Sequence, residues 1–143
     1  MANTLYEIYV HIIFGTLNGE KLIPEELLNN LHAYIASIFF KRQCHDICVG
    51  GISNHVHILT SHPKDILIPE MIKTVKIATH NKLTNQHKLN KFSWQNGYAV
   101  FSVSPTEIIK VKRYIKNQKE HHIKTSYEKE LKYIEMLLRK LEG

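Results

Sequence analysis

The sequence predicts an α+β fold of the ferredoxin-like βαββαβ class, an antiparallel sheet with helices on one face and additional C-terminal helices. The first observation is the order of hydrophobic patterns: strand, helix, strand, strand, helix, strand, followed by two more helical segments. The second is the length of 143 residues, which fits one domain over residues 1–143 with an ordinary hydrophobic core.

The first strand is expected over residues 5–14, where apolar residues alternate with the period of a strand. One face of this strand contains Tyr6, Ile8, Val10, Ile12 and Phe14. After the turn TLNGE, apolar residues recur at helical spacing from Pro24 to about residue 41, which predicts a helix. The segment CHDICVG is a short strand, and a turn at GISN joins it to a strand in HVHILT.

A second helix is expected over residues 68–83, with Pro69 near its start. The polar segment NQHKLNK predicts a loop, and GYAVFSVS predicts the fourth strand.

The helix that follows has the clearest start signal in the chain. Ser104 is expected to cap it, Pro105 to occupy its first position and Glu107 to complete a capping box. A last helix is expected to begin between residues 125 and 128. Its apolar stripe contains Leu131, Ile134, Leu138 and Leu141.

Composition favours a polyanionic partner without requiring one. The chain contains 19 Lys and Arg against 13 Asp and Glu, a formal net charge of +6. Each phosphate that such a protein neutralises releases condensed counterions, so basic charge favours nucleic acid. Many basic proteins of this size bind none, and charge alone does not decide.

The two cysteines and the hydropathy pattern predict a soluble cytoplasmic protein. Cys44 and Cys48 lie four residues apart on an expected strand, which places them on one face as reduced core thiols. The N-terminus lacks the basic and apolar regions of a signal peptide, and no apolar run approaches the ~18 residues of a membrane span. We therefore expect no membrane association.

Two histidines stand at alternate positions in SNHVHILTSHPK. On a strand, His55 and His57 project side by side, while Val56 and Ile58 point to the other face. This geometry suits two ligands that converge on one ion. It suits a half-exposed strand equally well.

The helix after Ser104 places a phenol and an amide one turn apart. Tyr114 and Gln118 are four residues apart on one face. A neighbouring apolar stripe, which would dock the helix, contains Ile108, Val111 and Ile115. If the helix lies across the face that bears His55 and His57, these four side chains converge.

Such a group contains two imidazoles and an amide oxygen, with neither thiolate nor carboxylate, and leaves positions on a divalent ion for phosphate oxygens. Mg²⁺ or Mn²⁺ would fit a phosphate substrate. Imidazole ligands would also suit Zn²⁺ or Ni²⁺, so the residues do not fix the identity of the metal. Tyr114 is the candidate nucleophile, although a phenol with a pKa near ~10 needs a base or a cation to attack. A phosphotyrosine conserves the phosphodiester, which favours cutting and rejoining over hydrolysis.

The elements NHVHILTS, FSWQNGYAVFSVSP and VKRYIKNQKEHH resemble the signatures of single-tyrosine HUH transposases. These are the transposases of bacterial insertion sequences of the 200/605 type and their relatives associated with repetitive extragenic palindromes. The resemblance covers most of the chain, from HIIFGT to EHH. One departure is the turn TLNGEKL, which offers only Lys21 beside Glu20 where these proteins often carry several basic residues.

The resemblance implies a DNA transposase of ferredoxin-like fold that forms obligate homodimers partly by joining sheets. It implies a divalent ion held by His55, His57 and Gln118. Tyr114 would attack single-stranded DNA, become joined to a 5′ phosphate and leave a free 3′ hydroxyl, in its own subunit or in that of the partner. The substrate would be hairpin DNA at the element ends.

Two other functions stay open: a non-catalytic nucleic-acid-binding module of the same fold, and a metal-dependent phosphodiesterase in which water attacks. Candidates for contacts with the DNA backbone are Lys73, Lys76, Lys110 and Arg113, although helix lysines usually serve solubility.

Several further residues are assigned to ordinary structural roles. Trp94 and Tyr98 are more readily explained by core burial than by base stacking. His11 is left outside the site because edge exposure explains it, and His121 and His122 are assigned to a solvated helix end rather than to phosphate or metal.

Overall fold

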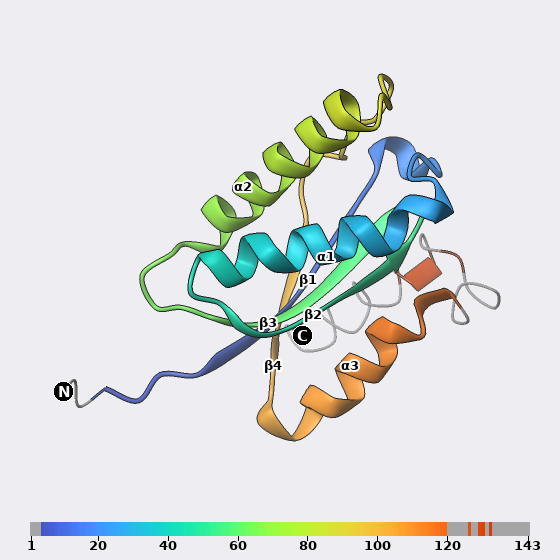
Figure 1. The fold of residues 1–143 in the computed structure, drawn as a ribbon. Coiled ribbons are helices and arrows are strands. Elements are labelled where there is room, and N and C mark those ends of the chain that lie inside the picture. The colour runs from blue at the N-terminus through green and yellow to red at the C-terminus, as the bar shows by residue number, and fades with distance from the viewer. Residues whose placement is uncertain (1–3, 120–125, 127–128, 131, 133–143) are drawn as a thin grey trace.

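The computed structural model describes residues 4–119, 126, 129, 130 and 132. Its strands and helices follow the predicted order (Figure 1). They are β1 (Ile8–Gly15), α1 (Glu25–Lys41), β2 (His45–Ile52), β3 (His55–His62), α2 (Ile68–Asn81), β4 (Ala99–Val103) and α3 (Ile108–Lys116). In this part of the chain no helix is both long and apolar enough to cross a membrane.

The four strands form one antiparallel sheet in the order β2-β3-β1-β4, which confirms the predicted fold class. β1 starts three residues later than predicted, because its pairing with β3 ends where Ile8 faces His62. Since β1 and β3 are the two central strands, neither has a free edge.

Helices α1 and α2 cover one face of the sheet, as predicted (Figure 1). The main core lies between them and the strands. Its largest fully buried side chains include Ile12, Phe14, Leu31, Ile35, Phe39, Ile58 and Met71. This packing leaves the alternate residues of β1 and β3 directed to the other face.

Helix α3 lies on that second face, against β2 and β3 (Figure 1). A smaller cluster of buried residues joins it to the sheet: Tyr9, Cys48, Leu59 and Ile115. The approach is closest at Gly50, where an added Cβ would stand 2.4 Å from the backbone oxygen of Ile115. The missing side chain of Gly50 therefore sets how closely the helix approaches β2.

The start of α3 is capped as predicted, with a difference in detail. Ser104 Oγ accepts a hydrogen bond from the backbone N–H of Thr106 at 3.3 Å, whereas the N–H of Glu107 bonds the Ser104 backbone oxygen at 2.9 Å. The expected capping box is therefore wrong, because the first turn, Pro105–Glu107, is a tighter 3₁₀ helix. The predicted last helix lies mostly outside the described residues, where its apolar stripe also falls.

The two cysteines are buried and free but do not share a face, which corrects the expectation from their spacing. Cys44 belongs to the core under α1 and α2, while Cys48 packs under α3. The reason is a register shift in β2 between His45 and Cys48, where Asp46 has a φ of 52°. An irregularity of this kind breaks the alternation from which the face was predicted.

Asp46, at this irregularity, anchors α3 to the sheet. Its carboxylate accepts hydrogen bonds from the hydroxyl of Tyr9 at 2.9 Å and from Nζ of Lys112 on α3 at 2.5 Å. These partners, Lys112 first and Tyr9 second, hold the pKa of Asp46 below its usual value.

This anchor predicts a pH dependence of stability. Because the pKa of Asp46 is lower in the folded state, its contribution is present above the unfolded value of ~3.9 and is lost as the pH falls through the folded value. The Asp46→Asn variant should therefore be less stable than wild type at pH 7, and the difference should shrink below about pH 4. Urea unfolding at several pH values measures this difference; a constant difference would contradict the role of the charge.

Candidate active site

The histidine pair of β3 lies on the face of the sheet that α3 covers. Both side chains are buried, and their ring centroids are 5.0 Å apart. The alternative interpretation, in which His55 and His57 lie on a half-exposed strand, is therefore wrong. Two buried imidazoles need polar partners, and α3 brings them.

The structure brings the other two predicted side chains to the same place within one chain. Gln118, just beyond the end of α3, is buried and places its Oε1 3.0 Å from Nε2 of His55. The ring of Tyr114 meets that of His57 edge to face at a centroid distance of 5.5 Å. The two residues were expected on one helix, but α3 ends at Lys116 and Asn117 departs from helical geometry, so Gln118 reaches the histidines from just beyond the helix that carries Tyr114.

A carboxylate that the sequence reasoning missed completes this group. Glu130 is buried, with Oε1 3.2 Å and Oε2 3.8 Å from Nε2 of His57 and His55 respectively. It also accepts a hydrogen bond from the hydroxyl of Tyr114. The side chains that meet here therefore include a carboxylate, which the donor set predicted from the sequence did not contain. No local pattern links Glu130 to a helix sixteen residues earlier, so the sequence held no signal for this contact.

These contacts shift two pKa values in opposite directions. Burial alone would raise the pKa of Glu130, but the hydrogen bonds and charges of His57, Tyr114 and His55 lower it to about 2. Burial, followed by the hydrogen bond and charge of Glu130, raises the pKa of Tyr114 above its usual value. At neutral pH the phenol is protonated and directs its proton at a carboxylate.

The donor set fits a divalent ion. One nitrogen from each of His55 and His57 and one oxygen of Glu130 lie within 4.8 Å of one another, and all three side chains are buried. The amide oxygen of Gln118 faces the same space. Nitrogen and oxygen donors without a thiolate suit several divalent metals, including Mg²⁺, Mn²⁺ and Zn²⁺.

His11 also belongs to this site, which corrects its assignment to an exposed edge. Its Nε2 lies 2.8 Å from Nδ1 of His57, and the side chain is buried. The expectation failed because β1 is paired on both sides and has no free edge. Burial, together with the nearby His57, lowers the pKa of His11 to about 3, so its ring is neutral at physiological pH.

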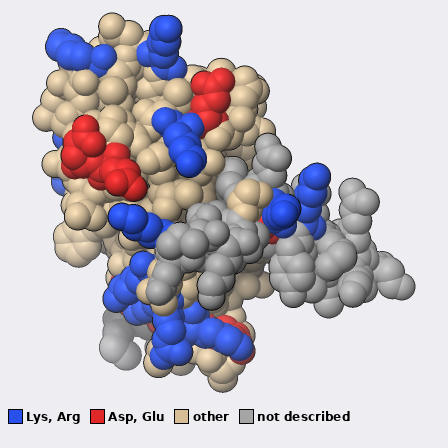
Figure 2. Space-filling view, turned by 90° about the vertical axis from the view of Figure 1, so that its right-hand side faces the viewer, with Lys and Arg blue, Asp and Glu red and all other residues tan. Residues whose placement is uncertain are grey.

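The four basic residues predicted to contact DNA do not form one surface. Lys73 and Lys76 are on α2, whereas Lys110 and Arg113 are exposed on α3, on the opposite face of the sheet and close to Tyr114. Figure 2 shows lysine and arginine side chains gathered over the lower part of the molecule, where α3 lies. The basic residues of α3 and of the three residues that follow it are Lys110, Lys112, Arg113, Lys116 and Lys119.

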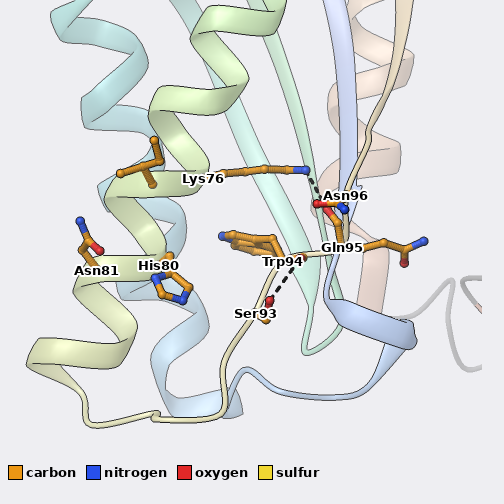
Figure 3. Close-up of a pocket in the computed structure, with 8 residues that line it drawn as sticks. Lys76, His80, Asn81, Ser93, Trp94, Gln95 and Asn96 are labelled. Atoms are coloured by element: carbon orange, nitrogen blue, oxygen red, sulfur yellow. Dashed lines mark hydrogen bonds between the residues drawn. The ribbon is translucent and has the colours of Figure 1, made fainter.

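Lys76 has a structural role beside a surface pocket of about 320 Å³ between α2 and residues 93–96 (Figure 3). Its Nζ donates to the backbone oxygens of Gln95 at 2.9 Å and Gly97 at 2.7 Å. Nζ also lies 5.4 Å from the centroid of the Phe14 ring. These contacts hold the segment before β4 against α2.

The prediction of core burial is confirmed for Trp94 and wrong for Tyr98. Trp94 is 8% exposed and packs on two phenylalanine rings, Phe14 and Phe92. Tyr98 is 43% exposed, because it precedes β4 at the edge of the sheet. The histidines 121 and 122 lie outside the described residues.

Trp94 provides a test of this packing. Its Nε1 donates to Oγ1 of Thr79 at 2.9 Å in the core. We expect Thr79→Val, which keeps the shape but removes the acceptor, to lower the free energy of unfolding by about 1–3 kcal/mol. Thr74→Val on the same helix should change it by less than about 0.5 kcal/mol. Urea unfolding, followed by the fluorescence of the single tryptophan, measures the free energy of unfolding of both variants. Equal effects of the two substitutions would contradict a stabilising role for the hydrogen bond between Trp94 and Thr79.

Comparisons with known proteins agree with this fold. A family model described as "Transposase IS200 like" matches residues 4–118. None of the curated protein sequences matches the chain. The solved structure of a candidate transposase from Deinococcus radiodurans is 20% identical, with a TM-score of 0.64, and the match covers 82% of this chain and 95% of that one. A REP-associated tyrosine transposase bound to a REP hairpin is 14% identical, with a TM-score of 0.59 and coverage of 85% and 74%.

Proposed function

This chain belongs to the IS200-like transposase family, and from that premise we propose that it cleaves and rejoins single-stranded DNA through a 5′-phosphotyrosine at Tyr114. The observation that carries the proposal is the convergence of this phenol with the two imidazoles of His55 and His57 and the amide of Gln118. These are the groups that a metal-assisted tyrosine nucleophile requires.

In the cleavage step, Oη of Tyr114 forms a bond to phosphorus while the bond from phosphorus to the 3′ oxygen breaks. As the bond from Oη to phosphorus forms, the phenolic proton becomes acidic and passes to Glu130, which already accepts its hydrogen bond. The departing 3′ oxygen takes a proton from solvent and becomes a free hydroxyl. In the rejoining step, the oxygen of a 3′ hydroxyl forms a bond to phosphorus while the bond from phosphorus to Oη of Tyr114 breaks; the hydroxyl proton passes to solvent, and Tyr114 takes back the proton that Glu130 received.

His55, His57 and Gln118 would hold a divalent ion, Mg²⁺ or Mn²⁺, and Glu130 offers a further oxygen. When bound, the ion supplies Lewis-acid polarisation of the scissile phosphate. The four side chains come from β3, from the end of α3 and from the C-terminal segment, so the site forms only when these parts of the chain are packed together.

Hairpin-bearing single-stranded DNA is the proposed substrate. The REP-associated transposase of similar fold is bound to a REP hairpin, and the basic surface of α3 lies beside Tyr114 in this chain. On that surface, Lys110 and Arg113 are exposed and would contact phosphates. We further propose that the protein acts as a homodimer.

The products distinguish this function from its alternatives. The experiment incubates the protein and Mn²⁺ with a hairpin-bearing single strand that carries a different label at each end. We expect the fragment on the 3′ side of the cut to migrate with the protein, and the other fragment to end in a 3′ hydroxyl that a polymerase extends. Free fragments without an adduct would support the phosphodiesterase, and retention of uncut DNA would support the binding module.

A further inference from the structure

The two candidate ligand histidines on β3, His55 and His57, each have a specific partner at Nδ1, the ring nitrogen that points away from the site. Nδ1 of His55 lies 2.8 Å from Oδ1 of Asn54, and Nδ1 of His57 lies 2.8 Å from Nε2 of His11. The inner nitrogens, Nε2 of both rings, face Gln118 and Glu130. Both imidazoles therefore direct Nε2 toward the same space and Nδ1 away from it, although their ring planes are 74° apart and their partners come from different parts of the chain.

The partner of His55 can be oriented from its second contact. The amide nitrogen of Asn54 donates to the backbone oxygen of Gly19 at 3.1 Å, so its Oδ1 is the atom that faces His55. An amide oxygen only accepts hydrogen bonds, and Nδ1 of His55 must therefore carry the proton. In the neutral ring, Nε2 is left with its lone pair.

The atom facing that lone pair is also an acceptor. Nε2 of Gln118 donates to the backbone oxygen of Tyr114 at 3.2 Å, which turns Oε1 toward His55 Nε2 at 3.0 Å. In the neutral form of the ring, two lone pairs at this distance repel each other, and a cation between them, either a proton or a metal ion, turns the contact into an attractive one. Adjacent ligands of an octahedral ion with bonds of ~2.1 Å are separated by about 3.0 Å, so the spacing suits a pair of metal ligands.

In the contact between His11 and His57, one ring must donate and the other must accept. Either ring can be the donor, depending on which tautomer each adopts. When Nε2 of a neutral His57 gives its lone pair to a cation, the single ring proton is on Nδ1. His11 must then accept that proton with its Nε2. A buried, neutral imidazole is able to do so.

We propose that Asn54 and His11 are positioning residues that hold the ligand histidines in their Nδ1–H forms and direct both Nε2 lone pairs at one divalent ion. This inference rests on the metal site of the proposed function. Neither residue contacts the ion; each acts through the ring beside it. His11, which orients His57, is on β1, and Asn54, which orients His55, is in the turn between β2 and β3.

The ring tautomers can be measured directly by ¹⁵N NMR of histidine-labelled wild-type protein. We expect His55 in the metal-free protein to carry its proton on Nδ1, and His57 to carry it there once Mg²⁺ or Zn²⁺ is added. A scalar coupling across the hydrogen bond should link Nδ1 of His57 with Nε2 of His11. The inference is overturned if His55 carries its proton on Nε2, or if His57 does so in the metal-saturated protein. This test uses wild-type protein only.

The second readout is the affinity for Mn²⁺, measured by electron paramagnetic resonance. Asn54→Ala and His11→Phe should weaken binding about 10–100-fold. Asn54→Asp and His11→Gln, which keep an acceptor oxygen, should restore most of it. The control is His62→Gln, which removes a buried imidazole on the opposite face of β3 and should leave the affinity unchanged.

The outcomes separate this inference from the function on which it rests. Unchanged Mn²⁺ affinity in folded Asn54→Ala and His11→Phe protein would overturn the positioning roles and leave the transposase proposal intact. Wild-type protein that binds no Mn²⁺ would overturn both the metal site and the inference. Loss of affinity that Asn54→Asp and His11→Gln fail to restore would assign the effect to altered packing and overturn the inference alone.

Discussion

Replacement of Tyr114 by phenylalanine is expected to abolish the covalent protein–DNA adduct and to lower strand cleavage by about a thousandfold or more, with DNA binding retained. Phenylalanine keeps the ring that packs against His57 and removes only the hydroxyl that bonds Glu130. The adduct is measured on a denaturing gel with labelled DNA and Mn²⁺, and binding by fluorescence anisotropy.

Tyr34→Phe is the matched control, because Tyr34 lies on α1, across the sheet from the candidate site. This variant should form the adduct at the wild-type rate. If Tyr114→Phe cleaves DNA as fast as wild type and releases both fragments, water is the nucleophile and the phosphodiesterase alternative replaces our proposal.

Gly50→Ala is expected to slow cleavage by about 10–100-fold although Gly50 belongs to no catalytic group. The added Cβ would stand 2.4 Å from the backbone oxygen and 2.7 Å from Cγ2 of Ile115, so α3 must move away from β2. Ile115 is adjacent to Tyr114, and a displacement of about 1 Å at a nucleophile can cost about 10²-fold in rate. The same overpacking should destabilise the protein by about 1–3 kcal/mol.

Gly97→Ala separates the position of α3 from a general loss of stability. A Cβ at Gly97 meets nothing within 4 Å, but the φ of +91° strains any other residue. We expect this variant to unfold at a lower urea concentration and still cleave at the wild-type rate per folded molecule. If Gly50→Ala is destabilised as much as Gly97→Ala and still cleaves at the wild-type rate per folded molecule, the close approach of α3 does not position Tyr114.

Patterns within one element predicted the elements well. Alternation and helical spacing located the strands and helices, and the i, i+4 spacing placed Tyr114 and Gln118 on one face. These signals work because the side-chain period of a helix or strand is set by its own backbone. The structure then placed that face against His55 and His57.

The errors arise where a property depends on distant parts of the chain. His11 was assigned to an edge because strand order is not a local property, and Glu130 was missed because its contact with Tyr114 spans sixteen residues. Cys44 and Cys48 were expected on one face because their spacing does not reveal the irregularity in β2. Nor did the sequence indicate that the ammonium group of Lys76 bonds the backbone oxygens of Gln95 and Gly97, because only the folded chain brings these atoms together.

The account depends on one cation site shared by His55, His57 and Gln118 beside Tyr114. A crystal of the protein saturated with Mn²⁺, with anomalous diffraction recorded at the manganese edge, tests this site most directly. The account predicts an anomalous peak bonded to Nε2 of both histidines and to Oε1 of Gln118, next to the Tyr114 hydroxyl. Manganese bound only at surface carboxylates, with the histidine pair bound to none, would contradict it.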